Sequence, residues 1–130
     1  MILDSSAVIA VLFREKHYQR LREAMAATDV LAIGAPTLFE TGMVAAGKLD
    51  LQGRALVAQF LERWNVAVTP FDDRHSQVAL GAFLRYGKGR HPAALNFGDC
   101  MAYATAKIAD VPLLFTGNDF AQTDLTSALA

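Results

Sequence analysis

Hydrophobic residues form short continuous runs that alternate along the chain with longer amphipathic segments. The continuous runs lie at residues 2–3, 30–35, 66–71 and 112–116 and predict strands that are buried on both faces. Strands that alternate with helices predict an α/β fold, in which a central, mostly parallel sheet is flanked by helices on both faces. The expected helices run from Ser5 or Ser6 to about Phe13, over 16–29, from Pro36 through Lys48, from a cap at Asp50 along an apolar face that includes Trp64, from a cap at Asp72 or Asp73 to about Tyr86, and within 95–110.

Length and composition are those of one globular domain, residues 1–130. Of the 130 residues, 53% are hydrophobic. Asp4 interrupts the N-terminal hydrophobic segment, which neither a secretion signal nor a spanning helix favours, so we expect a cytoplasmic protein without a membrane partner. Cys100 is the only cysteine, which excludes an internal disulfide. Because the net charge is −1, any binding of nucleic acid has to come from local basic clusters.

Four of the 13 acidic residues fall where the carboxyl ends of the predicted strands meet. Asp4 ends the first strand, Glu40 lies shortly after the second, Asp99 opens a helix, and Asp119 follows the last strand. Binding sites gather at this edge of parallel sheets. An acid near a helix N-terminus is also stabilised by the helix dipole, by a few tenths to about 1 kcal/mol, so each acid taken singly has a second explanation.

The faces on which two of these acids lie favour a functional role. Glu40 shares a helical stripe with Met43, and Asp99 shares one with Tyr103. Carboxylates are rarely buried without a partner, and neither helix offers a Lys or Arg one turn away. Four neighbouring carboxylates would repel one another without a cation, and a set of oxygen ligands suits magnesium or manganese. The three histidines show no ligand spacing, which disfavours zinc.

Four sequence blocks, in order and spacing, resemble the acidic blocks of PIN-domain ribonucleases, and most closely the VapC-like toxins of bacterial toxin–antitoxin pairs. The blocks are "MILDSSAVIAVL", "TLFETGMV", "YGKGRHPAALNFGDCMAYATAKI" and "PLLFTGNDFAQTD", and the resemblance runs from Met1 to about Leu125. It implies a PIN-like three-layer α/β/α fold. It also implies that the catalytic, metal-binding acids are Asp4, Glu40, Asp99 and Asp119, with Ser6 and Asn118 near the metal. Asn118 is an alternative to Asp119, because the spacing in the last block varies within the family.

The resemblance implies metal-assisted hydrolysis of RNA phosphodiester bonds by an endoribonuclease. Magnesium, with manganese as a substitute, would lower the pKa of a water held by Asp99 or Glu40 and direct it at phosphorus. Asp4 and Asp99 are expected to contact the ion directly, and Glu40 and Asp119 partly through water. The products would carry a 5′ phosphate and a 3′ hydroxyl. Whether one or two ions bind stays open.

The densest basic stretch is "RYGKGRH", directly before the Asp99 helix. Arg85, Lys88 and Arg90 are candidate phosphate contacts, and Tyr86 is a candidate stacking surface for a base. An ordinary solvated loop is the alternative. The resemblance further implies a homodimer and a small antitoxin partner, through which alone DNA would be contacted. The antitoxin would lie in an apolar groove, for which the candidate residues are Leu38, Phe39, Leu56, Phe60 and Trp64, all of which a protein core would also explain.

Two other function classes remain at this point. A phosphatase with an aspartate nucleophile is disfavoured, because its pattern requires a second Asp two residues after Asp4, where this chain has Ser6. A regulatory α/β module that binds a structural cation predicts metal binding without turnover, as an alternative to a toxin or to a PIN nuclease with another role. The RNA that is cut does not follow from the sequence.

Overall fold

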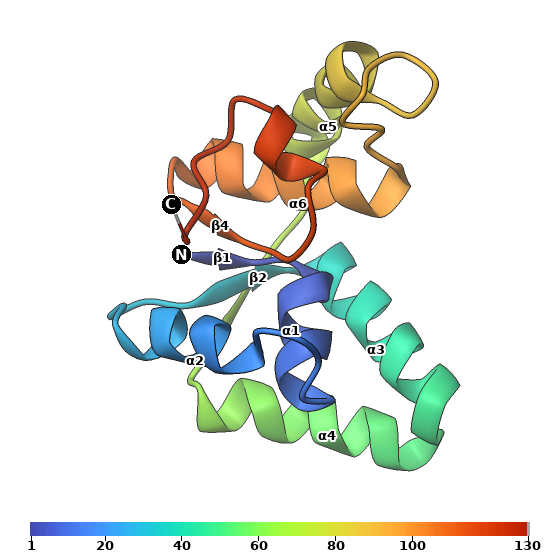
Figure 1. Cartoon of the computed structure of the whole chain (residues 1–130). Helices are drawn as coiled ribbons and strands as arrows, with labels where there is room; N and C mark the ends of the chain where they lie inside the picture. The colour runs from blue at the N-terminus through green and yellow to red at the C-terminus, as the bar shows by residue number, and fades with distance from the viewer. Residues whose placement is uncertain (130) are drawn as a thin grey trace.

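The computed structural model describes residues 1–129, which fold around a four-stranded parallel sheet (Figure 1). The strands are β1 (Ile2–Leu3), β2 (Ala32–Gly34), β3 (Ala67–Thr69) and β4 (Leu113–Leu114), and they lie in the order β3-β2-β1-β4. In β1, Ile2 pairs with Ala32 on one side and with Leu113 on the other. This arrangement confirms the predicted α/β fold with a parallel sheet.

Helices cover the sheet from both sides, because alternate strand residues point to opposite faces. The helices are α1 (Ser5–Leu12), α2 (Tyr18–Ala26), α3 (Ala35–Leu49), α4 (Leu51–Arg63), α5 (Asp73–Tyr86) and α6 (Phe97–Ala109), with a short 3-10 helix, η1 (Phe120–Gln122). Ile2 and Leu113 belong to the core beneath α5 and α6, and Leu3 and Leu114 to the core with α1 and α2. Figure 1 shows these two layers above and below the strands.

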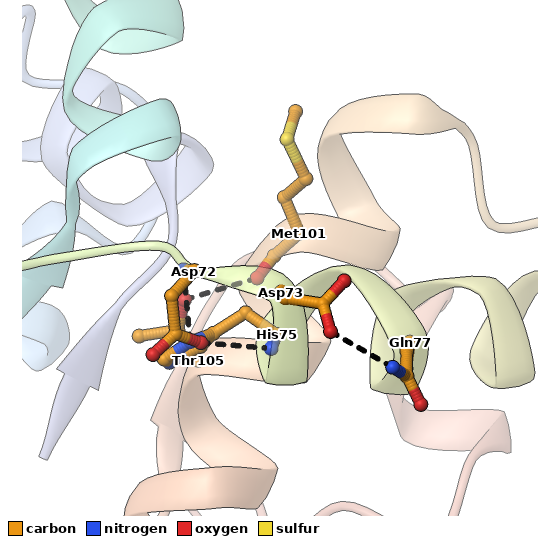
Figure 2. Close-up of polar contacts among 6 residues, drawn as sticks. All are labelled: Asp72, Asp73, His75, Gln77, Met101 and Thr105. Carbon is orange, nitrogen blue, oxygen red and sulfur yellow. Dashed lines mark hydrogen bonds and ion pairs between the residues drawn. The ribbon is translucent and has the colours of Figure 1, made fainter.

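The helices begin close to where the sequence predicted, and side-chain caps explain several of these starts. At α5, Asp72 accepts a hydrogen bond from the N–H of His75 (3.3 Å), and the His75 ring nitrogen accepts one from the N–H of Asp72 (3.3 Å). Figure 2 shows this capping box, with the Gln77 side chain reaching Asp73 in the next turn (3.0 Å). At α1 the cap is Asp4, so the prediction that Ser5 or Ser6 caps this helix was wrong.

Three other local predictions need correction. The predicted helix over 16–29 starts only at Tyr18, because His17 takes a left-handed conformation with φ 67°. Asp50 connects α3 to α4 with φ 50°, and its side chain makes no cap hydrogen bond. The predicted strand over 66–71 is shorter and is not buried on both faces, since Val68 is 46% exposed. β3 is an edge strand with one neighbour, and such strands receive less cover than central ones.

The segment after β4 returns to the sheet and is fixed to α6. Phe120 of η1 is buried against Phe115, with ring centroids 5.2 Å apart. Further on, the Asp124 carboxylate accepts hydrogen bonds from the Tyr103 hydroxyl (2.6 Å) and the Lys107 ammonium (2.8 Å). These contacts fix the loop that carries residues 116–119 at the carboxyl edge of the sheet. No helix within residues 1–129 is long and apolar enough to cross a membrane.

Candidate active site

Asp4 is the most buried of the four predicted acids, with 4% of its surface exposed. It follows β1 and precedes α1, so the strand delivers its carboxylate to the carboxyl edge of the sheet. The Ser6 backbone N–H (3.1 Å) and the Ser6 hydroxyl (2.5 Å) both donate to the same oxygen, Oδ2. The Ser6 hydroxyl in turn accepts a hydrogen bond from the Thr116 N–H (3.1 Å), so Ser6 connects Asp4 to the loop after β4.

Glu40 lies on α3, and two features of neighbouring segments set its position. The Ser5 hydroxyl donates a hydrogen bond to its Oε1 atom (2.8 Å). On the other side, α6 approaches so closely that a Cβ atom at Gly98 would overlap Oε2 of Glu40 and lie 2.8 Å from its Cδ. Only glycine leaves room for this contact. The Glu40 carboxylate therefore lies between the first turns of α1 and α6.

Asp99 lies in the first turn of α6, whose capping box holds its carboxylate in place. Its Oδ2 atom accepts a hydrogen bond from the Asn96 N–H (3.0 Å), and the Asn96 side chain accepts one from the Asp99 N–H (2.9 Å). The side chain is half-buried. Capping uses one oxygen of this carboxylate, which leaves the other oxygen as a donor to an ion.

Asp119 and Asn118 lie in the loop between β4 and η1, and both are exposed. The Asn118 carbonyl accepts a hydrogen bond from the Gln122 side chain (3.3 Å). Burial raises the pKa of Asp99, and the charge of Asp119 adds to this effect. Asp119 is the charged one of the two and stays the predicted fourth acid, with Asn118 as the alternative.

The electrostatics of the site show that the acids lie close enough to repel one another. Burial raises the pKa of Asp4 to about 6, and the charges of Asp99 and Glu40 add to this effect, against the opposing hydrogen bonds from Ser6. Burial also raises the pKa of Asp99, to which the charges of Asp119 and Glu40 contribute. The structure thus places the four predicted acids on four different segments at the carboxyl edge of the sheet, with Glu40 in contact with Ser5 and Gly98, the neighbours of Asp4 and Asp99.

The donor set fits a hard divalent cation that keeps part of its water shell. Within residues 1–129, none of the four carboxylates forms an ion pair with Lys, Arg or His. In the same range, no three His, Cys, Asp or Glu side chains form a group that could hold an ion by themselves. Magnesium takes one or two carboxylates and retains several waters. Oxygen donors without a protein cation are consistent with such an ion.

In the absence of metal, stability should fall as the pH rises through 6, because of Asp4. Folding raises the pKa of this carboxyl from 3.8 to about 6, so between these values the folded chain keeps a proton that the unfolded chain releases. Above pH 6 the folded chain carries an unfavourable buried charge, which corresponds to about 3 kcal/mol. Thermal unfolding in chelator from pH 4 to pH 7.5 measures this, with Asp4→Asn for comparison. The substituted chain should gain stability relative to the original as the pH rises, and a constant difference would contradict the assignment.

The basic residues before α6 are only partly free to bind RNA. Lys88 and Arg90 are exposed in the loop that leads to α6. Arg85 is exposed as well, but its guanidinium lies 3.8 Å from the Asp124 carboxylate and over the Tyr86 ring. Tyr86 is 5% exposed, so the prediction that it offers a stacking surface was wrong. Its ring packs into the core of α5 and α6 against Tyr103.

Two contributors to the site were not predicted from the sequence. Ser5 orients Glu40, and Gly98 makes room for it. The two adjacent serines after Asp4 could have indicated the contact of Ser5 with Glu40, because two hydroxyls at the start of a helix can donate hydrogen bonds to two different acids. The only indication for Gly98 in the sequence was its position next to Asp99. That α3 approaches α6 at this point follows from the fold and could not be predicted from the sequence.

Comparison with known proteins identifies the family of this chain. The PIN domain model matches residues 1–125. A VapC ribonuclease of Mycobacterium bovis, Mb2004c, is 43% identical over 126 residues, which make up 96% of this chain and 91% of the relative. Ribonuclease VapC of Mycolicibacterium smegmatis is 37% identical over 127 residues, 98% of each chain.

Solved structures agree on the fold. VapC20 of Mycobacterium tuberculosis, described as a toxin that cleaves the sarcin-ricin loop, superposes with a TM-score of 0.78 at 13% identity, covering 96% of this chain and 95% of its own. A toxin–antitoxin complex from Klebsiella pneumoniae gives a TM-score of 0.71 at 19% identity, covering 95% of this chain and 92% of that chain. The matched model and the relatives span nearly the whole sequence, and the chain belongs to the PIN domain family.

Proposed function

We propose that this chain is a magnesium-dependent endoribonuclease whose active site consists of Asp4, Glu40, Asp99 and Asp119. Ribonuclease activity follows from membership of the PIN family and from relatives that are VapC ribonucleases. The proposal is supported by the position of Glu40, which contacts Ser5 beside Asp4 and lies against Gly98 beside Asp99, and by the lack of an ion pair to any of the four acids within residues 1–129. A site of this kind needs a divalent ion to be stable when all four acids are charged.

The four acids have two kinds of role in the proposal. Asp4 and Asp99 would hold the ion directly, and Glu40 and Asp119 would hold it partly through water. When bound, the ion supplies a nucleophilic water at neutral pH and stabilises the charge that develops on the leaving oxygen. Glu40, oriented by Ser5, or Asp99 accepts a proton from the attacking water. Ser6 keeps Asp4 and the loop after β4 together during the reaction.

The basic loop before α6 positions the substrate. Lys88 and Arg90 are exposed a few residues before Asp99, where they can contact phosphates on either side of the bond to be cut. Arg85 can contact a phosphate of the RNA as well only if its guanidinium moves away from the Asp124 carboxylate. No side chain needs to form a covalent bond with the RNA, because water is the nucleophile.

Cleavage by the purified chain should require a divalent ion and should leave 5′ phosphates and 3′ hydroxyls. The reason is that an activated water attacks phosphorus and the 2′ hydroxyl takes no part. The measurement is digestion of total RNA with magnesium, with manganese and with chelator, followed by mapping of both ends. Cyclic phosphates, or equal cleavage in chelator, would overturn the proposal. Tight metal binding without any cleavage would favour the regulatory-module alternative.

We propose that an antitoxin helix binds in an apolar groove between α3 and α4. The groove has a volume of about 530 Å³ and is lined mostly by apolar side chains, including Leu38, Phe39, Met43 and Leu61. Phe39 is 70% exposed, which is unusual for an apolar side chain without a partner. Of the other residues predicted for this surface, Phe60 is buried in the core, and Leu56 and Trp64 line a different cavity. A neighbouring gene for a small DNA-binding protein would support the toxin role.

The proposal includes a homodimer and an antitoxin that contacts DNA. A homodimer would bury the exposed Leu80, Phe83 and Phe97, which line a cavity of about 450 Å³ between α5 and α6. DNA would be contacted only through the antitoxin, and the protein would act in the cytoplasm without a membrane partner.

A further inference from the structure

Three arginines surround a cavity that lies away from the acidic site. The cavity has a volume of about 330 Å³ and lies among the C-terminal end of α1, α2 and α4. Arg14, Arg22 and Arg63 line it, and no acidic residue does. Its volume falls at the lower end of the range of small-ligand pockets, roughly 300–1,000 Å³.

The arginines have no anionic partner in the part of the chain that the structure describes. Within residues 1–129, none of the three forms an ion pair with a carboxylate. Neighbouring Arg20, in contrast, donates a hydrogen bond to the Leu129 carbonyl (3.3 Å). Like charges around one cavity repel one another, and burial of part of Arg22 adds to this cost. A bound anion would relieve the repulsion.

Aromatic side chains complete the wall of the cavity and narrow the kind of anion that fits. Tyr18 and Trp64 are both half-buried lining residues, and Leu56 and Phe60 supply an apolar floor. Arginine contacts phosphate through its planar fork, and aromatic rings stack on nucleobases. Phosphate and base recognition are thus combined in one small site.

We propose that this cavity, lined by Arg14, Arg22, Arg63, Tyr18 and Trp64, binds a nucleotide of single-stranded RNA. The inference rests on the proposed function and adds a second contact to the substrate of the acidic site. α1 connects the two sites: Ser5 at its start contacts Glu40, and Leu12 at its end lines the cavity. The eight residues of α1 span about 12 Å, which a strand of a few nucleotides can bridge. Figure 1 shows α1 running from the sheet to α4.

The composition of the cavity favours RNA over an acidic peptide. The α3–α4 groove, which suits an apolar helix, has Arg54 as its only charged lining residue and no aromatic ring other than Phe39. The arginine cavity instead has three cations with a tyrosine and a tryptophan. Glu23 lies in an adjoining cavity that shares Arg22 and Trp64, so an acidic residue bounds the site on that side. An acidic peptide is the competing occupant, and the experiment includes it.

Trp64 is the only tryptophan of the chain, so its fluorescence reports on binding in this cavity and in the adjoining one that shares Trp64 and Arg22. The full chain is titrated with a short single-stranded oligoribonucleotide in chelator, which prevents cleavage, while the anisotropy of a labelled copy measures total binding. RNA should change Trp64 fluorescence saturably. Arg22→Gln/Arg63→Gln should weaken this response about tenfold and lower the slope of log affinity against log salt by about 0.7 for each phosphate that is no longer neutralised. Lys48→Gln/Arg74→Gln, with the same charge change elsewhere, should leave it unchanged.

Three results would overturn the inference. Anisotropy that rises while Trp64 fluorescence stays constant would place the RNA elsewhere. Equal weakening in both double variants would reduce the effect to net charge. A response to a peptide of glutamate and leucine, without one to RNA, would make the occupant a protein. The proposed function is judged separately, by ion-dependent cleavage with the unsubstituted chain, so that cleavage can persist when this inference fails.

Discussion

Replacing Asp99 by asparagine should lower RNA cleavage about a thousandfold and leave the fold intact, because the change removes one charge from the group that holds the ion. Asparagine has the size of aspartate, and its carbonyl oxygen can still accept the hydrogen bond from the Asn96 N–H that the Asp99 carboxylate accepts (3.0 Å). The loss should therefore appear in the cleavage rate and not in thermal stability. Since burial and the charges of Asp119 and Glu40 raise the pKa of Asp99, the metal-free variant should be at least as stable as the original at pH 7.

The matched control is Asp73→Asn, which removes a carboxylate from the first turn of the neighbouring helix α5. Asp73 is exposed, and its carboxylate accepts a hydrogen bond from the Gln77 side chain (3.0 Å, Figure 2). The measurement compares the cleavage rates of the original chain, Asp99→Asn and Asp73→Asn at the same magnesium concentration and with the same RNA. If Asp99→Asn cuts as fast as the original chain, the activity comes from a contaminating nuclease or from another site, and the four-acid assignment fails.

The position of the acids at the sheet edge could be predicted because it depends on local patterns. A short apolar run that ends in Asp4 indicates a strand that delivers this carboxylate to the carboxyl edge. The same rule predicted Asp119 after β4, and in the structure Asp4 follows β1 and Asp119 lies in the loop after β4. The apolar face shared by Asp99 and Tyr103 also indicated that the acid turns inward. These inferences needed no knowledge of which helices touch.

The errors arose where contacts between distant segments decide the structure. Tyr86 reads as a loop aromatic next to basic residues, but α6 packs over it and buries its ring. Val68 lies in a continuous apolar run, yet its strand ends up at the edge of the sheet. Arg85 looks free for RNA until the C-terminal segment returns with Asp124. The same return positions Asp119, so the contacts that limit Arg85 help to assemble the acidic site.

The arginine cavity illustrates the same dependence on the fold. Arg14, Arg22 and Arg63 are separated by up to 49 positions along the chain and form no basic run. Only the packing of α1, α2 and α4 gathers them around one space. Net charge, which is −1, gives no indication of such a cluster. A protein that must hold RNA next to four carboxylates benefits from cations that lie beyond the reach of those acids, where they do not neutralise the site.

Replacing Gly98 by alanine should lower cleavage about a hundredfold with little change in thermal stability, because the new methyl group takes the place of the Glu40 carboxylate. A Cβ atom there would overlap Oε2 of Glu40 and lie 2.8 Å from its Cδ. The Glu40 side chain is flexible and can turn away, which breaks its hydrogen bond to Ser5 (2.8 Å) without moving a helix. A displacement of about 1 Å in a catalytic group can cost a hundredfold in rate. Cleavage rate as a function of magnesium concentration, together with thermal unfolding, measures both effects.

Gly81→Ala is the matched control, because Gly81 is an exposed residue of α5 with no atom within 4 Å of its added Cβ. Both substitutions replace a helical glycine by alanine, and this replacement by itself stabilises a helix by up to about 1 kcal/mol. Only Gly98→Ala should lose activity. The double variant Gly98→Ala/Glu40→Asp, whose shorter acid leaves space for the methyl group, should recover part of the rate if displacement of the carboxylate is the cause. Equal rates for Gly98→Ala and Gly81→Ala would show that the position of Glu40 does not limit cleavage, and Glu40 would then lose its place among the catalytic acids.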